Sequence, residues 1–337
     1  MLDEQELQQV WYGGREPGWP LRVLAGVYAA VNALRRALYR AGLLRQVRLP
    51  VPVIVVGNIT AGGTGKTPLT IALVEALRLR GFRPGVISRG HGGSADDVQR
   101  VDGAADPARV GDEPYLISQA TGALVAVARD RVAAARLLLA QANPADVLIA
   151  DDGLQHYRLG RDVEICVIDG ARRFGNGRLL PAGPLREPVS RAARCDFRVV
   201  NGATAGAGET AMTLAGDEAI ALAGAATPLR RRLRDFAGQR VHAVAGIGNP
   251  ARFFTMLCDA GIDVIEHAFA DHHPFVAADL RFGDELPVLM TQKDAVKCAA
   301  FADTKMWSVP VHAQLPEAFY DTIVERVRQR KAVVGSR

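Results

Sequence analysis

Short apolar runs alternate with amphipathic segments along the first two-thirds of the chain. Most runs are rich in β-branched residues, which is typical of strands buried on both faces of a parallel sheet. The predicted strands are residues 51–56, 83–88, 124–128, 147–150, 164–168 and 197–200, and the predicted helices are about 68–80, 113–120 and 130–142. Residues 89–109 are rich in Gly and Asp and predict a long loop. This alternation predicts an α/β fold with a doubly wound, mostly parallel sheet and helices on both faces.

A second, smaller α/β segment follows a break in this pattern. Residues 203–224 are rich in Ala, Gly and Thr and predict a linker or hinge. The later predicted strands are residues 241–245, 264–269, 288–290 and 307–311, and the later helices are 250–260 and 316–330. We therefore place a domain boundary near residue 205, with a larger domain over 1–205 and a smaller one over 206–337.

The residues before the first strand predict an amphipathic helix over about 18–44. Its apolar positions recur at helical spacing within about 120° of arc; they are Leu24, Val27, Tyr28, Val31, Leu34 and Leu38. Arg22, Arg36 and Arg40 project to the opposite side. A basic amphipathic helix of this kind is typical of a helix lying in a membrane surface. A soluble helix that packs on the core and keeps its basic face in water has the same pattern.

Composition narrows the class of protein. The 337 residues suffice for two domains, and 49% hydrophobic with 23% charged residues excludes wholesale disorder. The four cysteines are widely spaced, which argues against a disulfide scaffold or a cysteine zinc site and favours reduced thiols. No apolar run approaches the ~20 residues of a transmembrane helix, and the first residues lack the pattern of a secretory signal.

Lysine is scarce in this chain. Only five of the 41 basic residues are lysines, and Lys66 is the only one in the first 292 positions. A lone lysine among arginines indicates a site that needs a compact ammonium group rather than a planar guanidinium. The net charge of +5 is modest, and we expect no nucleic-acid partner and no obligate protein partner.

The strongest chemical signal is a Gly-rich loop between a predicted strand and a predicted helix, the context that a phosphate-binding loop requires. Its residues are Thr60, Ala61, Gly62, Gly63, Thr64, Gly65, Lys66 and Thr67. Lys66 is expected to reach the β- and γ-phosphates of a nucleotide, and the Thr67 hydroxyl to bind Mg²⁺. The strict G-x-x-x-x-G-K-[ST] pattern fails because Thr60 occupies the first glycine position. The alternative is a Gly-rich turn with an incidental lysine.

Two carboxylates, Asp151 and Asp152, end the predicted strand 147–150. In phosphate-loop proteins, a carboxylate at such a strand end holds Mg²⁺ through its water shell. Two aspartates at an ordinary strand-to-loop turn are the alternative. The Gly-rich loop upstream favours the metal-binding interpretation.

Three further segments carry titratable groups. Asp112 is a candidate general base, although Asp112, Glu113 and the following Pro also describe the start of a helix. The Asp271-His272-His273 segment could tune a base or be a surface turn. Residues 291–294 nearly match the [NT]-K-x-D motif that recognises guanine in GTP-binding proteins, but the lysine lies one position too late.

Taken together, these motifs resemble one family, the tetraacyldisaccharide 4′-kinases, the lipid A 4′-kinases of Gram-negative bacteria. The order and spacing of the motifs carry the resemblance, which spans most of the chain. The matching segments are residues 11–12, 55–68, 88–90, 111–114, 151–156, 175–188, 245–250, 271–273 and 293–298. Two positions depart from the family pattern: His91 stands where Tyr is usual and Gln292 where Glu is usual.

The resemblance implies a phosphate-loop kinase that uses Mg-ATP to phosphorylate the 4′-hydroxyl of a tetraacyldisaccharide 1-phosphate, which gives lipid IVA. It implies that Lys66 and Thr67 bind ATP and Mg²⁺, and that Asp151 and Asp152 bind the metal. It also implies Asp112 as general base, His272 as its partner across the domain cleft, and Glu113 as support for the metal. Closure about the hinge at 203–224 would exclude water.

The resemblance also bears on the N-terminal helix. A substrate with four acyl chains stays in the bilayer, so an in-plane basic helix would hold the enzyme against anionic lipids at the cytoplasmic face of the inner membrane. Two other functions fit parts of the pattern. One is a GTPase or a nucleotide-driven metal-insertion protein. The other is a non-catalytic membrane adaptor that binds nucleotide only as a structural ligand.

Overall fold

The apolar runs form the strands of two sheets in the computed structural model, which describes residues 4–90, 93, 97–223 and 229–335. The larger sheet has nine strands. In spatial order they are β15 (His312–Gln314), β8 (Thr210–Ala215), β7 (Phe197–Asn201), β6 (Val163–Asp169), β1 (Val53–Gly57), β5 (Val147–Ala150), β2 (Pro84–Ser88), β4 (Leu124–Val127) and β3 (Gln99–Val101). All neighbours from β8 to β4 pair in parallel, and only the edge strands β15 and β3 run antiparallel. The predicted mostly parallel sheet is confirmed.

Helices cover both faces of this sheet, because alternate strand residues point to opposite sides. On one face, α3 (Lys66–Leu79), α5 (Asp112–Thr121) and α9 (Glu317–Gly335) share a core with Ile54 and Val56 of β1. On the other face, α6 (Arg131–Leu139) packs against Val53 and Val55. The predicted long loop at 89–109 is wrong in part, since it contains β3 and the short helix α4 (Pro107–Val110). Strand β3 forms only by pairing with β4, about 26 residues further along the chain, which the local sequence does not show.

The smaller sheet has six strands. In spatial order they are β10 (Arg230–Arg232), β9 (Glu218–Ala221), β14 (Met306–Val309), β13 (Val288–Thr291), β11 (Arg240–Ala245) and β12 (Asp263–Ala268). Helix α7 (Pro250–Asp259) packs on one core of this sheet through Phe253, Phe254 and Leu257, and α8 (Gln292–Cys298) packs on the other through Ala295 and Cys298. Single 3₁₀ turns lie at Val189–Arg194, Leu233–Phe236, Ala277–Leu280 and Ala299–Phe301.

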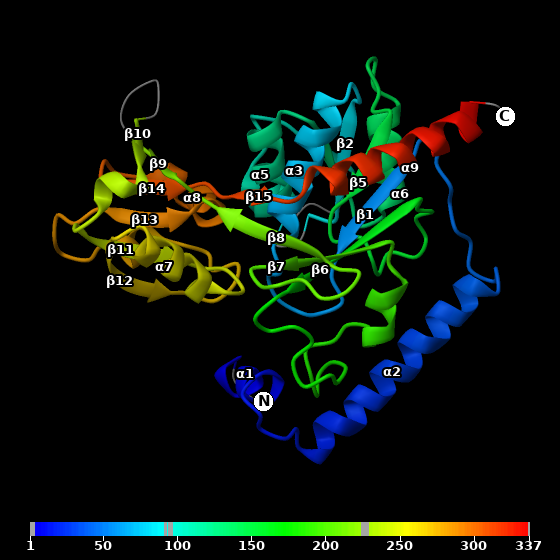
Figure 1. The fold of residues 1–337 in the computed structure, drawn as a ribbon, viewed down its shortest axis with the longest axis horizontal. Helices are drawn as coiled ribbons and strands as arrows, with labels where there is room; N and C mark the ends of the chain where they lie inside the picture. Colours follow the sequence, from blue (N-terminus) through cyan, green and yellow to red (C-terminus); the bar gives the residue numbers. More distant parts are fainter. Residues whose placement is uncertain (1–3, 91–92, 94–96, 224–228, 336–337) are drawn as a thin grey trace.

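The two sheets divide the chain differently from a single cut near residue 205. Strand β8 follows that position but belongs to the larger sheet, and β15 and α9 return to the larger sheet at the end of the chain. Residues 216–217 therefore link β8 to β9, and residues 310–311 link β14 to β15. Figure 1 shows β8 and β15 lying where the chain passes between the two sheets.

The N-terminal segment lies against one side of the larger sheet's body. Helix α1 (Glu4–Trp11) is followed by the long helix α2 (Trp19–Arg40), which runs along the outside of the molecule (Figure 1). Four of the six residues of the apolar stripe of α2, Leu24, Val27, Val31 and Leu34, are each 55–61% exposed, whereas Tyr28 and Leu38 are half-buried. Most of the stripe is therefore not packed on the core. Among the described residues, none of the helices combines the length and the hydropathy needed to cross a bilayer.

Candidate active site

The Gly-rich loop connects β1 to α3, as the sequence predicts. Gly65 has φ +92°, and a Cβ on it would lie 2.4 Å from the Asn201 side chain, so only glycine fits there. Asn201, at the end of β7, donates to the carbonyl of Thr64 at 3.0 Å, and Asn58 donates to the carbonyl of Gly62 at 3.3 Å. Thr60 and Ala61 are tied to the segment at 184–185 through a strand-like bridge and a 2.7 Å backbone bond. These contacts anchor the loop at the start of α3.

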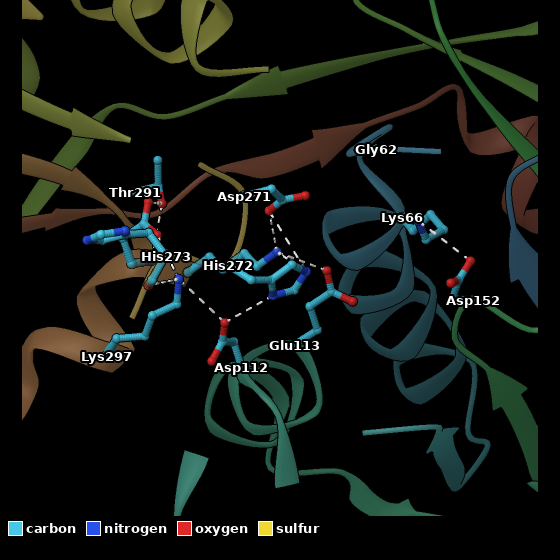
Figure 2. Close-up of polar contacts among 12 residues, drawn as sticks. Gly62, Lys66, Asp112, Glu113, Asp152, Asp271, His272, His273, Thr291 and Lys297 are labelled. Atoms are coloured by element: carbon cyan, nitrogen blue, oxygen red, sulfur yellow. Dashed lines mark hydrogen bonds and ion pairs between the residues drawn. The ribbon is translucent and has the colours of Figure 1, made fainter. Parts of the chain in front are cut away.

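Lys66 and Asp152 meet at the carboxyl edge of the larger sheet (Figure 2). Lys66 Nζ lies 3.6 Å from Asp152 Oδ1, and Arg186 Nη1 lies 3.0 Å from Asp152 Oδ2. Burial disfavours the Asp152 carboxylate, but the charges of Lys66 and Arg186 outweigh burial and hold its pKa below the ordinary value. Asp152 also has φ +47°, a strained conformation for a residue other than glycine. Arg186 is a contact that the sequence did not single out.

Asp151 is fully buried beside this pair. Its Oδ1 accepts a 3.0 Å hydrogen bond from Thr70 Oγ1, while Oδ2 has no hydrogen-bond partner among the described residues. Burial, and next the charge of Glu113, raise the pKa of this carboxyl. A buried carboxylate oxygen without a donor, beside a second carboxylate, is chemistry suited to Mg²⁺. The residues present therefore fit the predicted cation.

Asp112 begins α5 and faces side chains of the smaller sheet (Figure 2). Asp112 Oδ2 lies 3.4 Å from His272 Nδ1 and 3.5 Å from Lys297 Nζ. His273 instead contacts Asp279 Oδ2 at 3.0 Å, so His272 is the histidine that pairs with Asp112. Burial disfavours the Asp112 carboxylate, but the hydrogen bond from His272 and the charges of Lys297 and Lys293 lower its pKa.

Lys293 fixes which nitrogen of His272 carries the proton. Its Nζ lies 3.1 Å from Asp271 Oδ1, 3.3 Å from Glu113 Oε1 and 3.2 Å from His272 Nε2. Burial disfavours this ammonium, but Glu113 and Asp271 raise its pKa, so it stays charged. A lysine ammonium can only donate, so His272 Nε2 must accept and its Nδ1–H donates to Asp112. Glu113, predicted to support the metal, makes its ion pair with Lys293.

A cavity of about 190 Å³ lies between the phosphate loop and the smaller sheet. Gly63 to Thr67, Glu113 and Gln292 line its polar side, and Ile71, Leu214, Phe253, Met256 and Val309 line its apolar side. The loop at 246–249 closes it, and a Cβ on Gly248 would lie 2.2 Å from Gly63 N. Sequence reasoning missed this apolar wall, because ordinary core-type residues supply it and no motif marks them.

The segment at 291–294, which nearly matches the guanine-recognition motif, has a different role in the structure. Asp294 is fully buried and accepts from Gly246 N at 2.8 Å and from Thr291 Oγ1 at 2.6 Å, so its carboxylate is engaged within its own sheet. It is not presented to the cavity as a guanine-reading carboxylate would be. Of the two departures from the family pattern, Gln292 lines the cavity, whereas His91 lies outside the described residues.

Comparisons with known proteins agree with this geometry. Residues 17–328 match the family model described as tetraacyldisaccharide-1-P 4′-kinase. The chain is 55% identical over 327 residues to a tetraacyldisaccharide 4′-kinase of Stenotrophomonas maltophilia, with 94% of this chain and 95% of that protein covered. It is 56% identical over 333 residues to one of Xanthomonas euvesicatoria, with 95% of each covered.

Among solved structures, the "apo" form of LpxK from Aquifex aeolicus in complex with ATP is similar to this chain. The TM-score is 0.73 at 28% identity, and the match covers 90% of this chain and 97% of that one. The likeness therefore extends across both sheets.

Proposed function

The chain belongs to the tetraacyldisaccharide-1-phosphate 4′-kinase family, and from that premise we propose that it transfers the γ-phosphate of ATP to the 4′-hydroxyl of a tetraacyldisaccharide 1-phosphate, which gives lipid IVA in lipid A biosynthesis. One observation carries the proposal at the level of residues. A phosphate loop with its lysine and a carboxylate–histidine pair reach the same region from two different sheets (Figure 2).

The phosphate loop binds the nucleotide end of the reaction. Backbone N–H groups of residues 62–65 and the N-terminus of α3 attract phosphate oxygens, and Lys66 offsets the charge that develops on the transferring group. The apolar side of the cavity, at Ile71, Phe253 and Met256, offers a surface for the nucleobase. Thr67, Asp151 and Asp152 would hold Mg²⁺, with Glu113 nearby, and the ion would neutralise phosphate charge when bound.

Asp112 is the proposed base for the acceptor hydroxyl. As the 4′-oxygen forms its bond to the γ-phosphorus, the hydroxyl proton passes to the Asp112 carboxylate. The bond from the γ-phosphorus to the bridging oxygen breaks, and its electron pair leaves on ADP. His272 donates through Nδ1 to Asp112 and so orients this carboxylate.

Helix α2 is the proposed contact with the membrane that holds the lipid substrate. Its exposed stripe includes Leu34 at 61% and Val31 at 60% exposure, and Trp19 at the start of the helix is 75% exposed. Its inner face is tethered near the site, since Tyr28 donates to the carbonyl of Arg186 at 3.2 Å and Arg36 Nη1 lies 3.6 Å from buried Glu187. Because Arg186 also contacts Asp152, insertion of the stripe would bring the phosphate site to the lipid surface. The proposed location is the cytoplasmic face of the inner membrane.

The two linkers between the sheets are the proposed hinge. We place it at residues 216–217 and 310–311, where the chain crosses from one sheet to the other. The first linker lies within the predicted hinge segment 203–224, and the second lies outside it. Opening there would separate Gly248 from Gly63 and admit the nucleotide, and closure would exclude water.

The decisive experiment is transfer of labelled γ-phosphate from ATP to a tetraacyldisaccharide 1-phosphate acceptor in detergent micelles. Wild type is compared with Lys66→Ala and Asp112→Asn, and nucleotide binding is followed separately. We expect transfer by wild type, loss in both variants, and retained ATP binding in Asp112→Asn. Hydrolysis of GTP without transfer would instead support the GTPase function. Lipid binding without product would support the membrane adaptor.

A further inference from the structure

One carboxylate of helix α8, which packs on the smaller sheet, connects the loop at 246–249 to the proposed base. Asp294 Oδ2 accepts from the backbone N–H of Gly246, at the start of the loop that reaches Gly63 of the phosphate loop. Asp294 Oδ1 lies 3.1 Å from Lys297 Nζ. Lys297 Nζ lies in turn 3.5 Å from Asp112 Oδ2. The path from the phosphate loop to the base passes through buried Asp294 and half-buried Lys297.

The chemistry of Lys297 suits a junction of this kind. Its ammonium has three donor directions, and three oxygens surround it: His273 O at 3.2 Å, Asp294 Oδ1 and Asp112 Oδ2. The ammonium also lies over the Phe275 ring, with Nζ 5.4 Å from the ring centre. One compact nitrogen with three donors suits three surrounding oxygens, which accounts for a lysine in a chain that otherwise prefers arginine.

We propose that Asp294 and Lys297 are positioning residues that couple the loop at 246–249, seated on the phosphate loop, to the carboxylate of Asp112. This inference rests on the kinase function proposed above. Lys297 holds Asp112 Oδ2 together with His272, which leaves Oδ1 to face the acceptor hydroxyl. When the smaller sheet lifts away, Lys297 and His272 leave together, and Asp112 loses both partners. Phosphate transfer is thereby confined to the closed arrangement.

A double-mutant cycle tests the coupling in the full-length protein. Lys297→Met keeps an unbranched apolar side chain of similar length and removes the ammonium group. We expect kcat for transfer to fall about 10- to 100-fold, with KM for ATP changed by less than about threefold. The residual transfer of an Asp112→Asn variant should not fall further with the same substitution, because its effect acts through Asp112. Lys305→Met is the matched control, since Lys305 contacts exposed Glu285 on the same sheet and should leave kcat unchanged.

Chemical rescue provides a second readout that a purely structural role would not change. Lys297→Ala leaves a space for a small amine, so ethylammonium should restore part of kcat in that variant but none in Lys297→Met. Normal kcat in Lys297→Met, or equal losses with and without Asp112, would overturn the coupling while wild-type transfer upholds the kinase function. Absence of transfer by wild type would instead remove the kinase function itself.

Discussion

Lys66 and Asp152 come from two neighbouring parallel strands of one sheet, whereas Asp112 and His272 come from two different sheets and lie 160 residues apart in the sequence. The strands β1 and β5 are buried on both faces, so the loops that follow them are held by a packed core. The pairing of Asp112 depends instead on how the smaller sheet rests on α5. The phosphate-binding half is thus preorganised, and the proton-accepting half is assembled by contact between two units.

Lys66→Ala should give the largest effect and should act on the preorganised half alone. Without the Lys66 ammonium, Arg186 is the remaining cation beside Asp152, and the charge on the transferring phosphate is no longer compensated by Lys66. We expect kcat/KM for ATP to fall about 10²- to 10³-fold. Steady-state kinetics at saturating lipid would measure it. A loss confined to KM for the lipid would contradict the assignment.

Arg252→Met should weaken the contact between the two units and leave the phosphate loop itself unchanged. Arg252 Nη2, from α7, lies 3.1 Å from buried Asp169 Oδ2 at the end of β6 and donates to Asn201 O at 3.3 Å. Without it the smaller sheet is seated less firmly on the phosphate loop, so we expect KM for ATP to rise about tenfold. Arg240→Met, which breaks an exposed pair with Asp263, is the control and should leave KM unchanged.

Negative charges placed on the apolar stripe of α2 should weaken membrane binding without changing the rate of phosphate transfer. Val27→Glu combined with Val31→Glu places two carboxylates on the exposed apolar face. We expect partition onto anionic vesicles to weaken about 30-fold, because each charge near such a surface is worth about 1 kcal/mol and the two together about 2 kcal/mol. Turnover of nucleotide and acceptor in detergent should hardly change. Ala33→Glu, exposed but off the stripe, is the control; an equal loss there would contradict a specific membrane face.

Acid should destabilise the larger sheet through His156, with the smallest effect of the four. Burial, and next the charge of Arg131, lower the pKa of His156 to about 4, and Asp130 at 3.6 Å only partly opposes this. The unfolded chain binds a proton near pH 6.5, so it gains protons before the folded state does. Stability should therefore fall as pH decreases from about 6.5 to about 4.

Thermal unfolding across this pH range would measure the effect of His156. In His156→Gln the decline of Tm should be shallower by a few degrees, since no proton is taken up at that position. His312→Gln, on the exposed part of edge strand β15, serves as the control. Parallel curves for wild type and His156→Gln would show that this histidine does not account for acid sensitivity.

Most of the larger sheet could be predicted from the sequence because each strand is a short apolar run bounded by turn residues. The Gly-rich loop, Lys66 and the Asp151–Asp152 pair follow directly from those strands. Strand β15 could not be predicted in the same way, because its three residues are mostly exposed and pair only with β8. The same holds for β3, which pairs only with β4 and lies inside the segment predicted as loop.

The sequence by itself determined the chemistry available to this protein: a lysine after a Gly-rich loop, two carboxylates after a strand, and an aspartate and a histidine in separate segments. Local hydrophobic period and glycine placement suffice for that, because they act over a few residues. Only the tertiary structure decided that His272 rather than His273 meets Asp112, that Lys293 and Lys297 join them, and that Arg186 binds Asp152. Such pairings depend on how distant parts of the chain pack together, and no local sequence pattern predicts that packing.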